Sequence, residues 1–93
     1  MIEEIKNHLI TTLERHPNKY EILDKDYQDS VFLANYHCAN DGTTEFMIKI
    51  IIDDNNKIHL ILINEESSCR DELNNIVNNL EESVKEKFQH LLT

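Results

Sequence analysis

The side chains best suited to nucleophilic or metal chemistry are two histidines and two cysteines: His37, Cys38, His59 and Cys69. A thiolate–imidazole pair needs both groups on one side of the chain. Neighbouring residues of a strand point to opposite faces, so the adjacent His37 and Cys38 cannot form that pair. His37 and His59 could meet across a sheet, but zinc requires three or four convergent ligands, and no recognisable spacing supplies them. We therefore expect no metal and no cofactor.

The two cysteines are far apart in the sequence and match neither a disulfide framework nor a zinc motif. The first residues, Met1-Ile2-Glu3-Glu4, are acidic where a signal peptide is basic, and no long apolar run follows. The sequence thus predicts a soluble cytoplasmic protein, located in the host cytoplasm if a phage encodes it. In that reducing compartment we expect both cysteines to be buried or half-buried thiols.

Paired carboxylates could act as a general acid and a general base, and the chain contains Glu65-Glu66 and Glu81-Glu82. The segment Asp53-Asp54-Asn55-Asn56 has the composition of a calcium loop but lacks its alternating ligands, central glycine and final glutamate. The single glycine of the chain provides no loop that could cradle a phosphate. The sequence therefore predicts a binding protein and not an enzyme.

Acidity is the dominant feature of the composition. The 93 residues include 18 Asp and Glu against 9 Lys and Arg, which gives a formal net charge of -9 at pH 7. Such a surface repels phosphate backbones and anionic lipid at long range. Direct binding to nucleic acid or to a membrane is therefore disfavoured, because both need a basic footprint. A basic protein partner is favoured.

The hydrophobic pattern predicts a single α+β domain over residues 1–93, with the element order α-β-β-β-β-α. Residues 2–16 have their apolar side chains on one helical stripe, and Pro17 ends that helix. Strands are expected at residues 20–23, 31–38, 44–52 and 57–63, and tight turns between the last three indicate an antiparallel meander. A long C-terminal helix has apolar residues at spacings of three and four: Leu73, Ile76, Val77, Leu80, Val84, Phe88 and Leu91.

Two groups of apolar residues exceed what the core of a single domain needs, and they indicate an interface. A C-terminal helix of about 25 residues spans roughly 37 Å, whereas strands of about seven residues span roughly 23 Å, so Phe88, Leu91 and Leu92 should extend beyond the sheet. The strands also have apolar residues opposite the main core face: Val31, Leu33, Met47, Ile51, Ile61 and Ile63. If both helices cover one face of the sheet, this second face is exposed, and a homodimer would cover it. If the helices lie on different faces, both faces are buried.

We expect the carboxylates to form bands at the strand ends and along the C-terminal helix. Neighbours on a helical face are about 5–6 Å apart, and the two ends of the strands are roughly 23 Å apart, which is similar to phosphate spacing and duplex width. The candidate partner-binding residues are Asp53, Asp54, Glu65, Glu66, Asp71, Glu72, Glu81, Glu82 and Glu86. The alternative interpretation is that these charges lie at turns and on helix faces because solvation favours them there.

In size, acidity, expected dimer and layout, the chain resembles the phage-encoded acidic DNA-mimic proteins that block host restriction, and most of all the anti-restriction nuclease (Arn) proteins of T-even phages. The resemblance lies in the Asn, Ile and Lys bias and in the acidic residues Asp53-Asp54, Glu65-Glu66, Asp71-Glu72, Glu81-Glu82 and Glu86. It concerns charge layout over the whole chain, so no functional residue is transferred by position. It implies binding, in place of DNA, to a modification-dependent restriction endonuclease of the McrBC type.

Two functional hypotheses follow. The leading one is a homodimeric DNA mimic whose carboxylates occupy the DNA-binding site of a basic protein and perform no chemistry. The alternative is a small acidic dimeric chaperone or adaptor that holds a partner segment on the apolar face of its sheet. The first predicts binding that weakens with salt, and the second predicts binding that resists salt.

Overall fold

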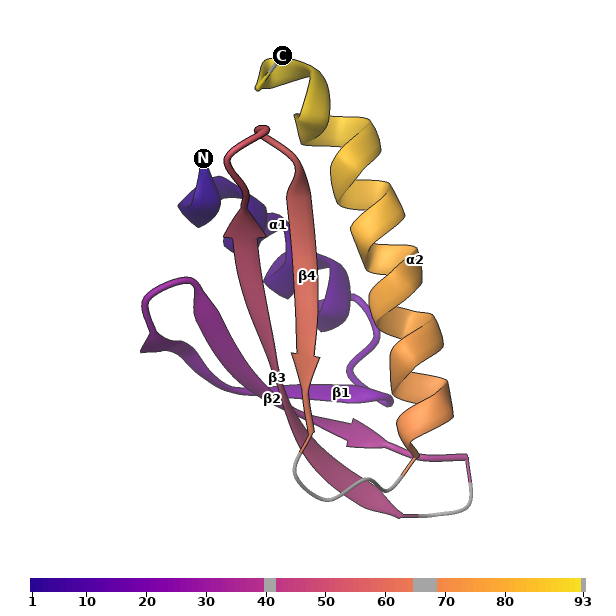
Figure 1. Ribbon diagram of the computed structural model, residues 1–93. Coiled ribbons are helices and arrows are strands. Elements are labelled where there is room, and N and C mark those ends of the chain that lie inside the picture. Colours follow the sequence, from indigo (N-terminus) through magenta and orange to yellow (C-terminus); the bar gives the residue numbers. More distant parts are fainter. Residues whose placement is uncertain (40–41, 65–68, 93) are drawn as a thin grey trace.

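The computed structural model describes residues 1–39, 42–64 and 69–92. The chain forms a helix, four antiparallel strands in one open sheet and a C-terminal helix (Figure 1), which confirms the expected order and class. The elements are α1 (Ile2–Glu14), β1 (Tyr20–Gln28), β2 (Val31–His37), β3 (Thr43–Ile52), β4 (Ile58–Ile63), α2 (Arg70–Phe88) and a short 3-10 helix η1 (Gln89–Leu91).

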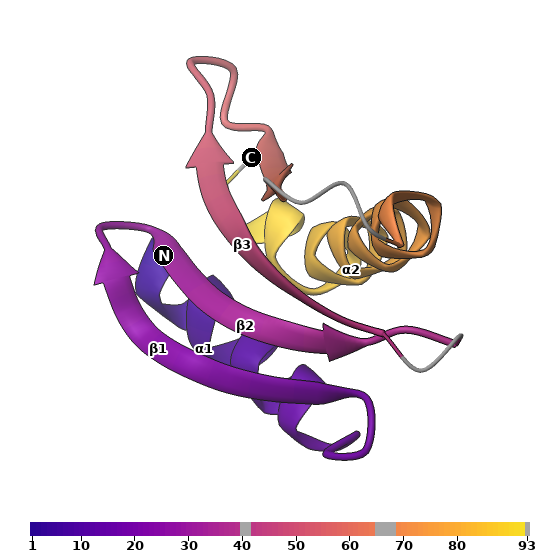
Figure 2. The ribbon, with the colours of Figure 1, turned by 90° about the horizontal axis from the view of Figure 1, so that it is seen from below.

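The sheet is a meander in the order β1-β2-β3-β4, and Figure 2 shows its strong twist. The pairing of β2 with β3 and of β3 with β4 is regular, whereas the register of β1 against β2 shifts between Ile22 and Asp24 and again before Gln28. These bulges keep the segment Asp24-Lys25-Asp26 inside a strand of 9 residues, whereas the sequence predicted a strand of only four residues that ends at residue 23. That prediction was wrong because an edge strand can accommodate bulges and charges.

Both helices cover the same face of the sheet. In Figure 1, α1 lies behind β3 and β4, α2 runs beside β4, and no helix crosses the front of these strands. The buried core combines side chains from both helices with alternate side chains of the strands, among them Ile5, Leu9, Leu13, Phe32, Phe46, Ile48, Ile50, Ile58, Leu73, Val77 and Val84. The first of the two helix arrangements left open by the sequence is therefore the one observed.

The C-terminal helix is shorter than expected. α2 contains 19 residues and continues into η1 without reaching the predicted 25. Phe88 is buried, and its ring lies edge-on to His8 with 5.6 Å between the centroids, so the expectation that Phe88 lacks partners was wrong. Leu92 packs against the core, whereas Leu91 is 58% exposed, as expected of a residue beyond the sheet. Within the described residues, no helix combines the length and apolar character needed to cross a membrane.

Candidate interaction surfaces and the cysteine pair

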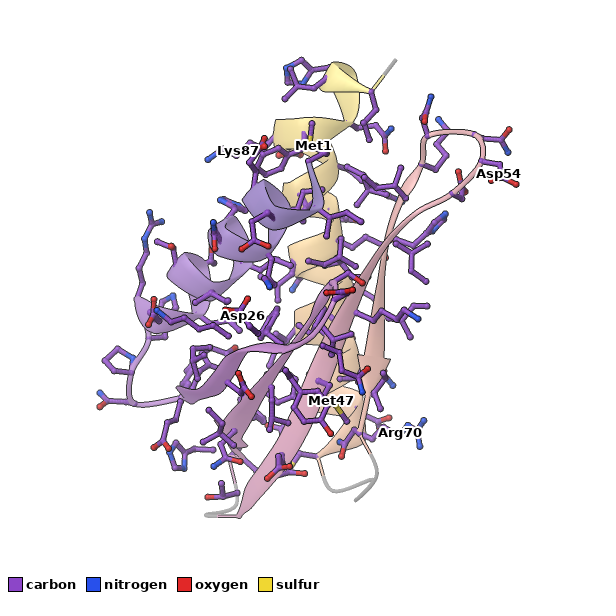
Figure 3. The ribbon with its side chains drawn as sticks, turned by 90° about the vertical axis from the view of Figure 1, so that its left-hand side faces the viewer. Met1, Asp26, Met47, Asp54, Arg70 and Lys87 are labelled. Atoms are coloured by element: carbon purple, nitrogen blue, oxygen red, sulfur yellow. A yellow bond between two sulfur atoms is a disulfide. The ribbon has the colours of Figure 1, made fainter. Side chains whose placement is uncertain are left out.

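The face of the sheet that no helix covers forms the first candidate surface, which we call the open sheet face. Its central row runs across three strands, because Leu33 pairs with Met47 and Met47 pairs with Ile63. Two further rows lie beside the central one. The first contains Val31, Lys49 and Ile61, and the second contains Ile51 and His59. All six apolar residues predicted for this face are on it, since side chains of a strand alternate between its two faces. Met47, labelled in Figure 3, lies at its centre.

The open sheet face is only partly covered by its own side chains. Ile61 is 43% exposed, and Leu33, Met47, Ile51 and Ile63 are half-buried. Val31 differs, because it is only 4% exposed and offers little to a partner. The exposed lysine Lys49 lies in the same plane. A partly exposed apolar patch of this kind is typical of an interaction surface.

The outer strip of α2 is the second candidate surface. Asp71, Glu82 and Glu86 are exposed there, opposite the buried stripe of the helix. Among the described residues, none of these three carboxylates has a basic group within ion-pair range. Asp71 and Glu82 are separated by roughly 16 Å along the axis, and the exposed amides Asn75, Asn78 and Asn79 lie between them. The strip therefore has charge at both ends and neutral amides in the middle.

Glu81, in contrast, points at the sheet and stabilises its edge. Its Oε2 accepts a hydrogen bond of 2.9 Å from the Leu60 backbone N–H, and its Oε1 lies 3.1 Å from Lys85 Nζ. Burial alone raises the pKa of Glu81, but these two contacts outweigh burial and lower it. Gln89 Oε1 similarly accepts a hydrogen bond of 3.1 Å from the Ile58 backbone N–H. The two side chains cover outward N–H groups of β4, so Glu81 has a structural role that sequence patterning did not reveal.

Asp53 and Asp54 lie in the turn between β3 and β4 but differ in their contacts. Asp53 Oδ1 accepts hydrogen bonds of 2.9 Å from the backbone N–H groups of Asn55 and Lys57, and Oδ2 is 2.8 Å from His59 Nε2. The hydrogen bond with His59, followed by those from the backbone, lowers the pKa of Asp53. Asp54 is exposed at the tip of the turn (Figure 3). Asp53 therefore organises the turn, and Asp54 is available to a partner.

The remaining predicted partner-binding residues are Glu72, Glu65 and Glu66. Glu72 is half-buried in the first turn of α2, where the Tyr36 hydroxyl donates a 3.4 Å hydrogen bond to its Oε1. Burial, and then the Glu72 carboxylate, raise the pKa of Tyr36. Glu65 and Glu66 lie outside the described residues. The structure thus brings Asp71, Glu82 and Glu86 together on one strip and places Asp53, Glu72 and Glu81 in internal contacts.

The cysteines are not free thiols, contrary to the expectation from sequence. Cys38 and Cys69 form a disulfide with a Cα–Cα distance of 6.1 Å, although 31 positions separate them. The bond joins the residue after β2 to the N-cap of α2. No local spacing signals this pair, because the fold of the meander brings the two ends together. The sequence placed Cys38 at the end of the predicted strand 31–38, but nothing in the pattern linked it to Cys69.

A metal site built from His37 and His59 is ruled out by the register. His37 pairs with Thr43 at one end of β3, and His59 pairs with Ile51 near the other end. The eight intervening steps span about 27 Å of strand. His37 Nδ1 instead lies 3.1 Å from Thr43 Oγ1, and His59 contacts Asp53.

One buried charge was missed by the sequence analysis. Lys6 is only 4% exposed, and its Nζ lies 2.7 Å from Asp26 Oδ1 and 3.4 Å from Glu3 Oε2. The hydrogen bond to Asp26 raises the pKa of Lys6 despite burial. This ion pair attaches α1 to the bulged edge strand β1, so it is a structural contact.

Comparison with known proteins finds no family model that matches the chain. No curated protein and no solved structure is significantly similar to it either. The function is therefore argued from the surfaces described above.

Proposed function

We propose that the protein is a homodimeric DNA mimic, which binds the DNA-binding site of a basic protein and performs no chemistry. The observation that supports this proposal is the set of exposed carboxylates on the outer strip of α2, Asp71, Glu82 and Glu86, which form no ion pair with the residues that the structure describes, in a chain with a net charge of -9. A basic groove that normally neutralises phosphates would gain comparable electrostatic attraction from these groups. Asp54 extends the same negative surface at the tip of the β3–β4 turn.

The second copy of the chain is the proposed occupant of the open sheet face. Glu45, Met47 and Lys49 alternate along β3 on this face. A two-fold axis through Met47 would bring Lys49 of one copy towards Glu45 of the other, so the charges on the face are self-complementary. Such a dimer buries the apolar rows and leaves the outer strip of each α2 exposed, which doubles the acidic surface.

The proposed partner is a basic DNA-binding protein in the cytoplasm, with a McrBC-type restriction endonuclease as the candidate implied by the family resemblance. Exclusion of DNA would then be competitive, because protein and duplex use the same groove. Direct contact between the protein and nucleic acid is not part of the proposal, since their charges repel.

Competition binding tests this proposal. The protein is immobilised, the candidate endonuclease is captured, and duplex DNA or salt is added in steps. Duplex DNA should release the endonuclease, and affinity should fall as the salt concentration rises. The double variant Glu82→Lys/Glu86→Lys should weaken capture, whereas Glu14→Lys/Asp29→Lys, with the same change in net charge elsewhere, should weaken it much less. A complex that survives excess duplex DNA would contradict the proposal.

The open sheet face also supports a second candidate function, that of a chaperone or adaptor. In this case the apolar rows hold a segment of another protein, and the acidity only keeps the protein in solution. Binding would then persist in high salt and would be lost in Met47→Glu. The charge-reversed variant Glu82→Lys/Glu86→Lys would bind normally, which is the opposite of the result expected for a DNA mimic.

A further inference from the structure

The surroundings of the disulfide contain a third metal-ligating group. One ligand atom each from Cys38, Cys69 and Glu72 lies within 4.8 Å of the others. Cys38 is buried, and Cys69 and Glu72 are half-buried, so the group is partly shielded from solvent. Cys69 is the N-cap of α2, with a left-handed backbone (φ 58°), and Glu72 follows in the first turn of the helix.

We propose that reduction of the disulfide creates a binding site for a thiophilic divalent metal, with Cys38, Cys69 and Glu72 as ligands and Zn²⁺ as the ion that fits best. Two thiolates and one carboxylate are suitable zinc ligands, and a water or a partner side chain would complete the tetrahedron. Zinc binds sulfur at about 2.3 Å and carboxylate oxygen at about 2.0–2.2 Å, so small movements of the three groups suffice. Magnesium and calcium prefer sets made of oxygen alone.

One side chain, Tyr36, prepares this site for a cation. The Tyr36 hydroxyl donates a hydrogen bond to Glu72 Oε1 at 3.4 Å and so orients the carboxylate. Such outer partners of metal ligands fix ligand geometry. Tyr36 is itself buried in the core on β2, so its position is held by packing. It is a positioning residue, because it would act on the metal only through Glu72.

The two states of the site exclude each other. A dithiol reductant transfers two electrons and two protons to the disulfide, becomes a cyclic disulfide itself and leaves two thiols on the protein. Zn²⁺ then binds both sulfurs as thiolates, and two protons are released. Conversely, an oxidant of the disulfide class that takes two electrons re-forms the Cys38–Cys69 bond and expels the ion. The same residues therefore stabilise the fold by a covalent bond when oxidised and by a metal when reduced.

Cobalt titration tests this inference independently of any partner protein. The full chain is reduced, freed of reductant without air and titrated with Co²⁺, whose thiolate charge-transfer and tetrahedral ligand-field absorption report both sulfur ligation and geometry. We expect one equivalent to bind and Zn²⁺ to displace it. The oxidised protein is the internal control and should show no such absorption, whatever the folding behaviour of any variant.

Variants separate the ligands from their surroundings. Glu72→Gln should weaken Co²⁺ and Zn²⁺ binding by more than about tenfold, and Tyr36→Phe should weaken it by about 10- to 100-fold. Asp71→Asn, one residue from Glu72 but exposed, should bind as the wild type does. Absence of thiolate absorption in the reduced wild type would overturn the proposal, and so would equal affinity in Glu72→Gln and the wild type.

Discussion

At the residue scale, His8 is held between apolar and basic groups. It lies on α1 against the Phe88 ring, and its Nδ1 is 3.5 Å from Lys87 Nζ. Burial, followed by the charges of Lys87 and Arg15, lowers the pKa of His8. Protonation of His8 therefore costs more in the folded protein than in the unfolded chain, and the folded state loses stability as His8 is protonated.

The first prediction concerns this loss in acid. The unfolded chain begins to protonate His8 near its ordinary pKa of about 6.5, whereas the folded protein protonates it only at lower pH. The free energy of unfolding should therefore decrease as the pH falls below about 6.5, and His8→Gln should remove part of that decrease. Urea denaturation of the wild type and of His8→Gln at several pH values between 7 and 5 measures this pH dependence. His16→Gln, at an exposed position, is the control, and identical pH profiles for wild type and His8→Gln would contradict the prediction.

The second prediction uses the neighbours Glu81 and Glu82. Glu81→Ala leaves the Leu60 N–H without its partner and should cost about 1–3 kcal/mol of unfolding free energy. Glu82→Ala removes an exposed carboxylate and should change it by less than about 0.5 kcal/mol. Glu81→Gln keeps an acceptor for the Leu60 N–H, so its cost in unfolding free energy should lie between the costs of Glu81→Ala and Glu82→Ala. Denaturant unfolding of the three variants at pH 7 provides the comparison, and equal costs at the two positions would show that Glu81 does not stabilise the β4 edge.

At the scale of elements, the disulfide joins the end of β2 to the start of α2. It closes a loop over 31 positions, which includes β3 and β4. By the chain-entropy model, a loop of that size contributes about 4 kcal/mol by restricting the unfolded chain. The bond therefore provides a large share of the stability of so small a domain.

The third prediction follows from that loop. Reduction with dithiothreitol in the presence of a chelator should lower the unfolding free energy by about 2–4 kcal/mol. The double variant Cys38→Ser/Cys69→Ser should be destabilised by a similar amount and should not respond to reductant. Chemical denaturation with a thiol count at each point checks the prediction. An unchanged midpoint in fully reduced protein would contradict it.

Elements were more predictable than contacts. Period-two alternation placed Met47 and Ile61 on the open sheet face correctly, because the face of a strand residue depends only on its register. The extent of β1 was missed, because charged residues such as Asp24 are typical of turns, and bulges leave no local signal. The disulfide between Cys38 and Cys69 and the contact of Glu81 with Leu60 are tertiary, and no periodicity encodes which distant groups meet.

At the scale of the whole molecule, both helices cover one face of the sheet, and no helix in the described part of the chain covers the other. The chain has principal extents of 42 × 22 × 22 Å, and the open sheet face runs across β2, β3 and β4. Strand edges do not offer an alternative interface, because β4 is covered by α2, and β1 is bulged and charged. Self-association is therefore expected to occur face to face.

The fourth prediction is a dimer that depends on the open sheet face. Sedimentation velocity of the wild type should give twice the mass of the 11.0 kDa chain, and Ile61→Glu should give a monomer because it places a charge in the apolar rows. Leu91→Glu, at a residue that is exposed but lies outside this face, should remain dimeric. A monomeric wild type at high concentration, or a dimeric Ile61→Glu, would contradict this arrangement.

The side chain of Gln89 protects one end of the outer edge of β4. Gln89 lies in η1, beyond the last turn of α2, and yet it occupies the N–H of Ile58. Proteolysis before this residue would free the Ile58 N–H at the outer edge of β4, although Glu81 would still cover the Leu60 N–H. That end of β4 would then be open to backbone pairing with a strand of another copy. Gln89 thus limits strand addition at this end of the sheet.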